Sequence, residues 1–405
     1  MPLRKFFRFL ASTIAALSLG TMGIVSYYSY ALPGQYSVFA DHSVALDSPG
    51  IYTSSSAPEQ RVANSLTESH GADVELSLFG MIPIKEAHVT KLVDQKVIPC
   101  GTPFGVKMLT NGVMVIGLSD ITTKDGVVNP AEEAGIQIGD VITSVNGISV
   151  SSNEQIGTIV SESDGEPISV ELTRDDVDQT VTLQPAMAYP GSTYKAGIWV
   201  RDSSAGIGII TFCLEDGVFG GLGHPICDVD TGAALPLGSG EIVEASINGI
   251  KKGYVGEPGE LCGTFTNDSS IGIVDYNSDA GIFGELSTPL SPHDAVEVGL
   301  KQEVKTGPAT IYTTLSGEDP QEYDIEILSV NVNDDSNNKN MVIKVTDPEL
   351  LAQTGGIVQG MSGSPILQNG KLVGAVTHVF VNDPTKGYGI FAENMLEVAE
   401  QLEQS

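Results

Sequence analysis

Positive charge and aromatic side chains are scarce in this sequence of 405 residues. It contains 20 Lys and Arg against 51 Asp and Glu, which gives a formal net charge of −31. A chain this acidic lacks the basic surface that binds nucleic acid or anionic lipid, so we expect neither partner. Aromatic residues make up 6% and Trp199 is the single tryptophan, whereas glycine, at 46 residues, is abundant. This composition is typical of a turn-rich β protein.

Cysteines are also few, with four in the chain. No Cys-x-x-Cys motif or His–Cys cluster is present, so the sequence predicts no metal site and no cofactor. An even number in an exported chain permits disulfides, and Cys213 with Cys227 is the pair we would test first. Four buried free thiols, these two with Cys100 and Cys262, are the alternative that we favour.

Charged residues are absent between Arg8 and Asp41. Within this gap Phe9 to Tyr28 is mostly apolar and, at about twenty residues, long enough to span a bilayer as a helix. Three basic residues precede it, which places the N-terminus in the cytoplasm and the rest outside. We therefore expect residues 1–31 to be an uncleaved membrane anchor; the alternative is a signal peptide cleaved after Ala31.

The chain beyond the anchor divides by composition and pattern. Residues 32–70 are rich in Ser, Ala, Gly and Tyr and are expected to form a flexible linker. Residues 71–98 contain strand-like runs that predict a small β unit. Residues 99–187 resemble a PDZ domain through the run Asn-Pro-Ala-Glu-Glu-Ala-Gly-Ile-Gln-Ile-Gly-Asp-Val-Ile-Thr-Ser-Val-Asn-Gly at 129–147. Residues 193–405 show many short strands with Gly and Asn turns.

Within the PDZ-like segment, Phe104-Gly105-Val106 has the apolar-Gly-apolar form of a carboxylate-binding loop. A capping box at Ser152 to Gln155 opens a helix with an apolar face. PDZ domains bind a peptide as an added strand between the strand of that loop and this helix. The sequence thus predicts a peptide ligand, which could include the chain's own N-terminal region; a spacer without a ligand is the alternative.

The run Gly360-Met361-Ser362-Gly363-Ser364-Pro365 is the form in which trypsin-like serine peptidases hold their nucleophile. The hydroxyl of Ser362 would project from a tight turn, and the N–H groups of Gly360 and Ser362 would form the oxyanion hole. An Asn-Gly hairpin follows, and its second strand would line the substrate pocket with Thr377, His378 and Val379. An ordinary Gly/Ser-rich hairpin is the alternative.

A serine nucleophile needs a base, and His224 is the candidate among six histidines. It follows an apolar strand, Ile207 to Phe212, and several glycines. Such glycines favour a close approach of the backbone that would hold the imidazole in a fixed position. A third residue must accept a hydrogen bond from the N–H of the other ring nitrogen. Asp347 is one candidate, although Asp347-Pro348 also predicts a helix start. Spacing leaves further candidates open: Asp228, Asp230, Asp275 and Asp279.

Taken together, these features resemble the stage IV sporulation protein B serine peptidases of endospore-forming bacteria. The resemblance rests on Leu222-Gly223-His224, on Asp228-Val229-Asp230-Thr231, on the Ser362 run and on the continuation Thr377 to Pro384. It implies His224 as base, Ser362 as nucleophile and a contribution from Asp347. It also implies self-cleavage near the N-terminus, location in the forespore intermembrane space, and cleavage of a membrane-bound partner that leads to activation of a late sigma factor.

We therefore expect a mainly β protein with an N-terminal transmembrane helix, a PDZ domain and a trypsin-like double β-barrel serine peptidase domain. The expected function is that of an extracytoplasmic serine endopeptidase with a peptide or protein substrate. Two alternatives stay open: a quality-control protease for exported proteins, and an inactive scaffold that binds through its PDZ domain.

Overall fold

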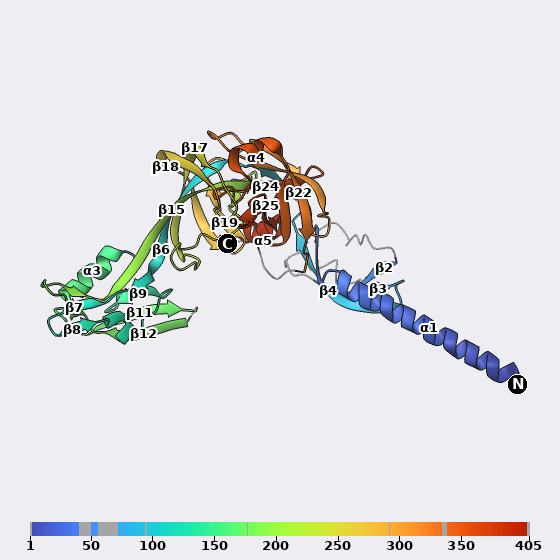
Figure 1. Cartoon of the computed structure of the whole chain (residues 1–405), viewed down its shortest axis with the longest axis horizontal. Helices are drawn as coiled ribbons and strands as arrows, with labels where there is room; N and C mark the ends of the chain where they lie inside the picture. The colour runs from blue at the N-terminus through green and yellow to red at the C-terminus, as the bar shows by residue number, and fades with distance from the viewer. Residues whose placement is uncertain are drawn as a thin grey trace.

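The computed structural model describes residues 2–39, 50–55, 72–93, 95–175, 177–290, 292–333 and 338–402. A long N-terminal helix, a small sheet, a double β-barrel and a PDZ unit follow one another in space (Figure 1). The chain is mainly β, as predicted. Most of the predicted 32–70 linker, with His42 and His70, lies outside the described residues.

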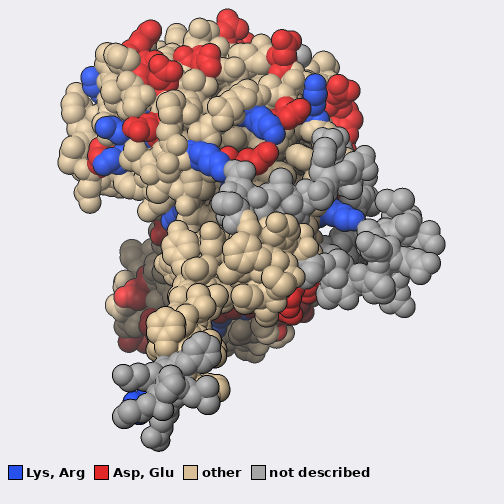
Figure 2. Space-filling model, turned by 90° about the vertical axis from the view of Figure 1, so that its right-hand side faces the viewer, with Lys and Arg blue, Asp and Glu red and all other residues tan. Residues whose placement is uncertain are grey.

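The N-terminal helix, α1 (Pro2–Ala31), projects away from the rest of the molecule (Figure 1). Its stretch Phe7–Ala31 has a hydropathy of 1.7 and is long and apolar enough to cross a membrane. Viewed from this end, acidic side chains are spread over the visible face of the molecule rather than gathered in one patch (Figure 2). The negative charge thus serves solubility more readily than it marks a binding patch.

A four-stranded sheet in the order β1-β4-β3-β2 follows the helix. Its strands are β1 (Gln35–Phe39), β2 (Ile51–Ser55), β3 (Ala72–Leu78) and β4 (Ile82–Leu92). The alternating pattern predicted a β unit over residues 71–98. The structure adds β1, which pairs in parallel with β4, and β2, which pairs with β3, so the prediction of a flexible linker is wrong for these two strands. Apolar side chains of this sheet form their own core, against which Val25 and Tyr28 of α1 pack.

Six strands close the first barrel, because each pairs with the next in the order β6-β17-β18-β19-β16-β15 and β15 pairs back with β6. They are β6 (Pro103–Leu118), β15 (Ile198–Cys213), β16 (Val218–Gly221), β17 (Leu237–Lys251), β18 (Glu260–Ser278) and β19 (Gly281–Leu286). Two short strands, β5 (Lys96–Pro99) and β20 (Val296–Glu297), extend this sheet beside β15.

The second barrel is closed in the order β21-β22-β23-β26-β25-β24. Its elements are β21 (Gly307–Thr313), β22 (Gln321–Val330), β23 (Met341–Val345), α4 (Pro348–Thr354), β24 (Pro365–Gln368), β25 (Lys371–Val379), β26 (Lys386–Phe391) and the C-terminal helix α5 (Ala392–Leu402). The predicted hairpin with Asn369-Gly370 as its turn is β24–β25, and the predicted C-terminal helix is α5. Two six-stranded barrels in series confirm the predicted double-barrel fold.

The PDZ unit is inserted into the first barrel, between β6 and β15. It contains β7 (Ile121–Thr123), β8 (Gly126–Val128), α2 (Pro130–Glu133), β9 (Val141–Val145), β10 (Ile148–Ser149), α3 (Asn153–Glu162), β11 (Ile168–Arg174), β12 (Val177–Leu183), β13 (Ala186–Met187) and β14 (Tyr194–Lys195). The far half of β6 pairs with β9 of this unit, whereas the near half pairs with β17 of the barrel. The predicted start of the PDZ unit at residue 99 is therefore corrected, because residues 103–110 belong to the barrel.

Candidate active site

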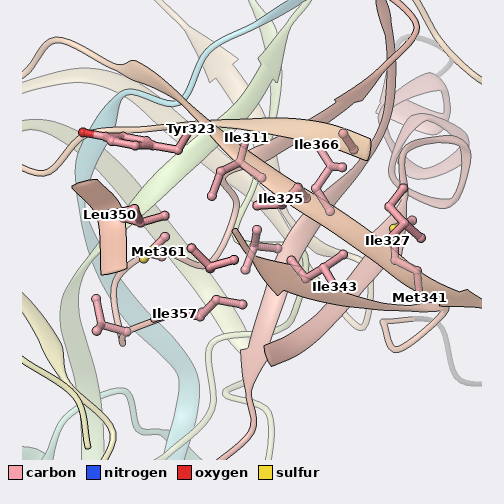
Figure 3. Packing of buried hydrophobic residues seen from close by; sticks show 14 of the residues in the cluster. Ile311, Tyr323, Ile325, Ile327, Met341, Ile343, Leu350, Ile357, Met361 and Ile366 are labelled. Carbon is pink, nitrogen blue, oxygen red and sulfur yellow. The ribbon is translucent and has the colours of Figure 1, made fainter. Parts of the chain in front are cut away.

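The nucleophile turn connects α4 to β24 and is held by its buried neighbours. Met361, fully buried, points into the core of the second barrel beside Leu350 and Ile357 (Figure 3). The hydroxyl of Ser364, also fully buried, donates to the carbonyl of Met361 at 2.8 Å. Burial on both sides leaves half-buried Ser362 as the residue that the turn presents.

Glycines on either side of Ser362 adopt conformations that other residues disfavour. Gly360 has φ +92° and Gly363 has φ +94°. A Cβ on Gly363 would lie 2.1 Å from the carbonyl oxygen of Ile209 and 2.6 Å from the backbone nitrogen of Leu222. The turn can therefore press directly against β15 and the end of β16 only with glycine at this position.

The N–H groups in this turn fall into two sets. Those of Met361, Gly363 and Ser364 donate to the carbonyls of Val358, Val376 and Met361, at 3.2, 2.8 and 3.0 Å. Those of Gly360 and Ser362 donate no hydrogen bond within the described part of the chain. Two unused donors beside a serine hydroxyl are what an oxyanion hole requires, so the structure supports the predicted pair.

His224 reaches the same place from the first barrel. It follows β16, and a Cβ on the preceding Gly223 would lie 3.0 Å from Cγ2 of Thr377 on β25. The ring of His224 lies 4.9 Å, centre to centre, from the ring of His378. The structure thus brings the predicted base, the nucleophile turn and the predicted pocket strand together where the two barrels meet.

The tautomer of His224 follows from its hydrogen bond. Its Nδ1 lies 2.8 Å from the carbonyl oxygen of Pro225, and because a carbonyl can only accept, Nδ1 must carry the proton. Nε2 is then the free base, the form that a serine peptidase needs. Burial lowers the pKa of His224, against a smaller opposite effect of the bond to Pro225.

The hydroxyl of Ser362 is turned away from this base in the structure. It donates to the carbonyl oxygen of Thr377 at 2.7 Å. Thr377 is itself buried, and its own hydroxyl donates to the carbonyl of Asn338 at 2.8 Å. Attack on a substrate would require rotation of the Ser362 side chain about χ1, which is a small movement.

The three predicted pocket residues lie at the end of strand β25. Thr377, His378 and Val379 stand where β25 loses its regular pairing with β26, since the register shifts between Val376 and Val379. Burial, the charge of His224 and that of Lys339 lower the pKa of His378 to about 4. His378 is therefore neutral at physiological pH and adds no positive charge next to the base.

Asp347 does not contact His224 in the structure. Its carboxylate caps α4 and accepts the N–H groups of Glu349 and Leu350 at 2.8 and 2.9 Å. This is the helix-start role that the sequence also allowed. The family resemblance implied a catalytic role for Asp347, and that role stays a prediction beside the helix cap that the structure shows.

Asp228 and Asp230, two of the remaining acidic candidates, form hydrogen bonds and ion pairs with residues other than His224. Asp228, buried, accepts the N–H groups of Asp230 and Thr231 and forms an ion pair with Arg201. Burial raises the pKa of Asp228, but these hydrogen bonds and the charge of Arg201 outweigh it and leave a net lowering. Asp230 pairs with the same Arg201. The two aspartates therefore hold the loop that carries His224.

Asp275 and Asp279 lie at the end of β18 and in the turn that follows it. Both side chains are largely exposed. The turn approaches the base, because a Cβ on Gly281 would lie 3.0 Å from the nitrogen of Gly223. Among the described residues, neither carboxylate forms a hydrogen bond with His224. The carbonyl of Pro225 is the group that orients the imidazole, and a backbone acceptor leaves no trace in a sequence.

One further predicted feature is corrected, and the cysteine prediction agrees with the structure in part. Phe104, Gly105 and Val106 lie in β6, paired with β15 on one side and β17 on the other, in the barrel rather than in a PDZ loop. Phe104 and Val106 are buried. All four cysteines are free thiols, as we favoured, but Cys227 is exposed and Cys262 is half-buried. Cys213 lies beside Cys100, with their sulfurs 3.5 Å apart.

A comparison with protein families decides which group the sequence belongs to. Residues 192–396, half of the chain, match the family SpoIVB peptidase S55, and residues 128–174 match the PDZ domain family. The chain belongs to the SpoIVB peptidase S55 family. It is therefore a serine peptidase with a PDZ domain, and the resemblance seen in the sequence is confirmed. Sixty residues are also 42% identical to the zinc metalloprotease RasP of Shouchella clausii, over 15% of this chain and 14% of that protein.

Similar solved structures include the HtrA-type protease AlgW with decapeptide, at 13% identity and a TM-score of 0.30, over 50% of this chain and 55% of that chain. They also include the Rv3671c protease in its inactive form, at 15% identity and a TM-score of 0.28, over 49% of this chain and 83% of that chain. The fold of this SpoIVB-type peptidase therefore rests on its own strand pairings rather than on these partial matches.

Proposed function

We propose that this peptidase is a membrane-anchored, extracytoplasmic endopeptidase that cleaves itself near its N-terminus and then cuts a membrane-bound regulatory protein. The family name supports a role in sporulation, as a signal between forespore and mother cell that activates a late sigma factor. The apolar helix α1 and the basic residues before it support the anchor and its orientation. The intermembrane space of the forespore is the corresponding location.

In this proposal Ser362 attacks the substrate carbonyl while Nε2 of His224 takes the hydroxyl proton. The unused N–H groups of Gly360 and Ser362 stabilise the oxyanion. His224 then gives its proton to the leaving amine, and water hydrolyses the acyl-enzyme by the same route. The observation that carries the proposal is this pair of free N–H donors beside Ser362. The first barrel adds His224, whose Nε2 is unprotonated and can act as the base.

A fluorophosphonate probe on the purified ectodomain tests the catalytic part. We expect label on Ser362, identified by peptide mapping, and loss of label in Ser362→Ala and in His224→Ala, because triad members act as a unit. Ser364→Ala is the matched control: its hydroxyl is buried and bonded to Met361, so label should persist. Label on Ser364 instead would move the nucleophile.

Self-cleavage is tested separately, by mixing full-length Ser362→Ala protein with active ectodomain. Cutting of the inactive chain near its N-terminus would support processing between molecules. If active chains mature while the mixed inactive chain stays intact, processing is intramolecular. Rapid degradation of an unfolded, casein-like protein by the ectodomain would instead favour the quality-control alternative. An intact full-length wild-type chain under conditions where Ser362 is labelled would contradict self-processing.

A further inference from the structure

The start of β15 lies in the position where a PDZ domain takes its peptide. Residues 198–201 pair antiparallel with residues 114–118 in the far half of β6. On its other side, the N–H of Asn153, the first residue of α3, donates to the carboxylate of Asp202 at 2.9 Å. A PDZ ligand binds as an added strand between a strand and a helix, and the chain's own strand occupies that place (Figure 1).

Side chains of this segment alternate between buried and exposed, as expected for a strand bound on one face. Ala196 is buried in the PDZ core, and Ile198 and Val200 pack against the same core. That core includes Ile156 and Val160 of α3. Trp199, between them in sequence, is 65% exposed and faces outward. One face of the segment therefore fills the groove and the other faces solvent.

Unlike a peptide ligand, this segment does not end in the groove. The carbonyl of Asp202 accepts the hydroxyl of Thr110 at 3.1 Å, and the strand then continues into the first barrel. Farther along, the N–H of Ile209 donates to the carbonyl of Ser362 at 3.2 Å, and the hydroxyl of Thr211 donates to the carbonyl of Gly363 at 2.7 Å. A single strand thus runs from the PDZ groove to the nucleophile turn.

The same strand also holds the base. Arg201, the residue after the apolar Val200 in this segment, forms ion pairs with Asp228 and Asp230 at 2.5 Å each. Both aspartates lie in the loop that begins at His224, where Asp228 organises the turn through Thr231. Displacement of β15 from the groove would therefore disturb the supports of His224 and of Ser362 together.

We infer that the PDZ groove is filled in cis by the segment Ala196–Asp202, which serves as a built-in ligand and connects the PDZ unit to both catalytic residues. The groove accepts an extended peptide in trans only when this segment leaves it. Because apparent affinity scales with the fraction of open molecules, a groove open about 1% of the time binds a trans peptide roughly 100-fold more weakly than an open one.

The test uses a fluorescein-labelled peptide with the sequence of residues 194–202, Tyr-Lys-Ala-Gly-Ile-Trp-Val-Arg-Asp, and fluorescence anisotropy with the whole ectodomain. The double variant Ile198→Ser/Val200→Ser weakens the cis segment and should bind the peptide, roughly 100-fold more tightly than wild type if the groove is then mostly open. Trp199→Ser changes the outward face of the same strand and should behave as wild type. A peptide with serine in place of both apolar residues should not bind.

Equal binding by wild type and by a folded double variant would overturn the proposal, as would no binding by the folded double variant. Circular dichroism checks that it folds. If it does not, amide hydrogen exchange of wild type decides. Slow exchange in residues 198–201, comparable to that of 207–211 in the barrel, supports a filled groove, and exchange as fast as in an exposed loop rejects it. Neither readout requires peptidase activity, so the outcome is independent of the proposed function.

Discussion

At the scale of single residues, the base of this site is oriented by a backbone carbonyl rather than by a carboxylate. His224 donates Nδ1–H to Pro225, and none of the acidic residues that the sequence offered bonds to its ring in the structure. A carbonyl fixes the tautomer but stabilises the imidazolium less than a carboxylate would. The site therefore has the orientation of a triad with weaker support for positive charge.

The pH dependence of activity should show this difference. Burial lowers the pKa of His224 below the ordinary value of 6.5. Only the neutral imidazole accepts a proton, so kcat/KM should be full at neutral pH and fall as the pH drops through a midpoint below 6.5. The measurement is kcat/KM against pH with a peptide substrate. A midpoint well above 6.5 would show that a carboxylate joins His224 in the working enzyme.

Asp347 offers a sharper distinction between a helix cap and a triad acid. Asparagine caps a helix about as well as aspartate, so Asp347→Asn should keep both stability and most activity, whereas Asp347→Ala should lower the free energy of unfolding by about 1 kcal/mol. Chemical denaturation and fluorophosphonate labelling measure the two effects. A folded, stable Asp347→Asn protein with activity reduced about 10⁴-fold would restore the triad role.

At the scale of elements, the nucleophile turn depends on contacts between the two barrels. Gly363→Ala would place a methyl group against the carbonyl of Ile209 and the nitrogen of Leu222, at a positive φ. Because those atoms are backbone, the turn must shift, and we expect loss of Ser362 labelling. Gly370→Ala is the matched control: it also has a positive φ, but open space surrounds it. It should cost stability, roughly 1 kcal/mol, without loss of label.

The elements that sequence reasoning identified correctly are those specified by adjacent residues. The Ser362 turn, the Asn369-Gly370 hairpin and the C-terminal helix each carry a local signal of turn glycines or apolar spacing. By contrast, Phe104-Gly105-Val106 matched a PDZ loop locally, and only pairing with β17, far along the chain, places it in the barrel. A strand shared by two domains has no local signature, so the insertion of the PDZ unit could not be read from the sequence.

At the scale of the whole molecule, the apolar helix α1, which we propose as the membrane anchor, is joined to the peptidase by more than the covalent chain. Ser37 of β1 is fully buried, and its hydroxyl donates to Glu393 of α5 at 2.9 Å. Glu393 also pairs with buried Lys301 at 3.0 Å and accepts the N–H of that lysine at 2.7 Å. The segment directly after α1 is therefore docked into the catalytic domain.

This docking limits where a cut can release the enzyme from the membrane. A cut beyond Phe39 leaves β1 attached to α1, while its pairing with β4 and the contact between Ser37 and Glu393 hold the peptidase in place. With a site for a foreign protease inserted between residues 40 and 49, we expect the cut Ser362→Ala protein to stay in the membrane fraction. Ser37→Glu should release it, because a second buried carboxylate beside Glu393 opposes docking.

Gln35→Glu is the control for that experiment, since it adds the same charge to the same strand at an exposed position. It should leave the cut protein on the membrane. Release of the cut protein without the Ser37 change would show that β1 dissociates by itself, and a cut anywhere before the catalytic domain would then suffice. Retention would mean that self-processing frees the enzyme only by cutting between α1 and β1, or by withdrawing β1 from its place beside β4.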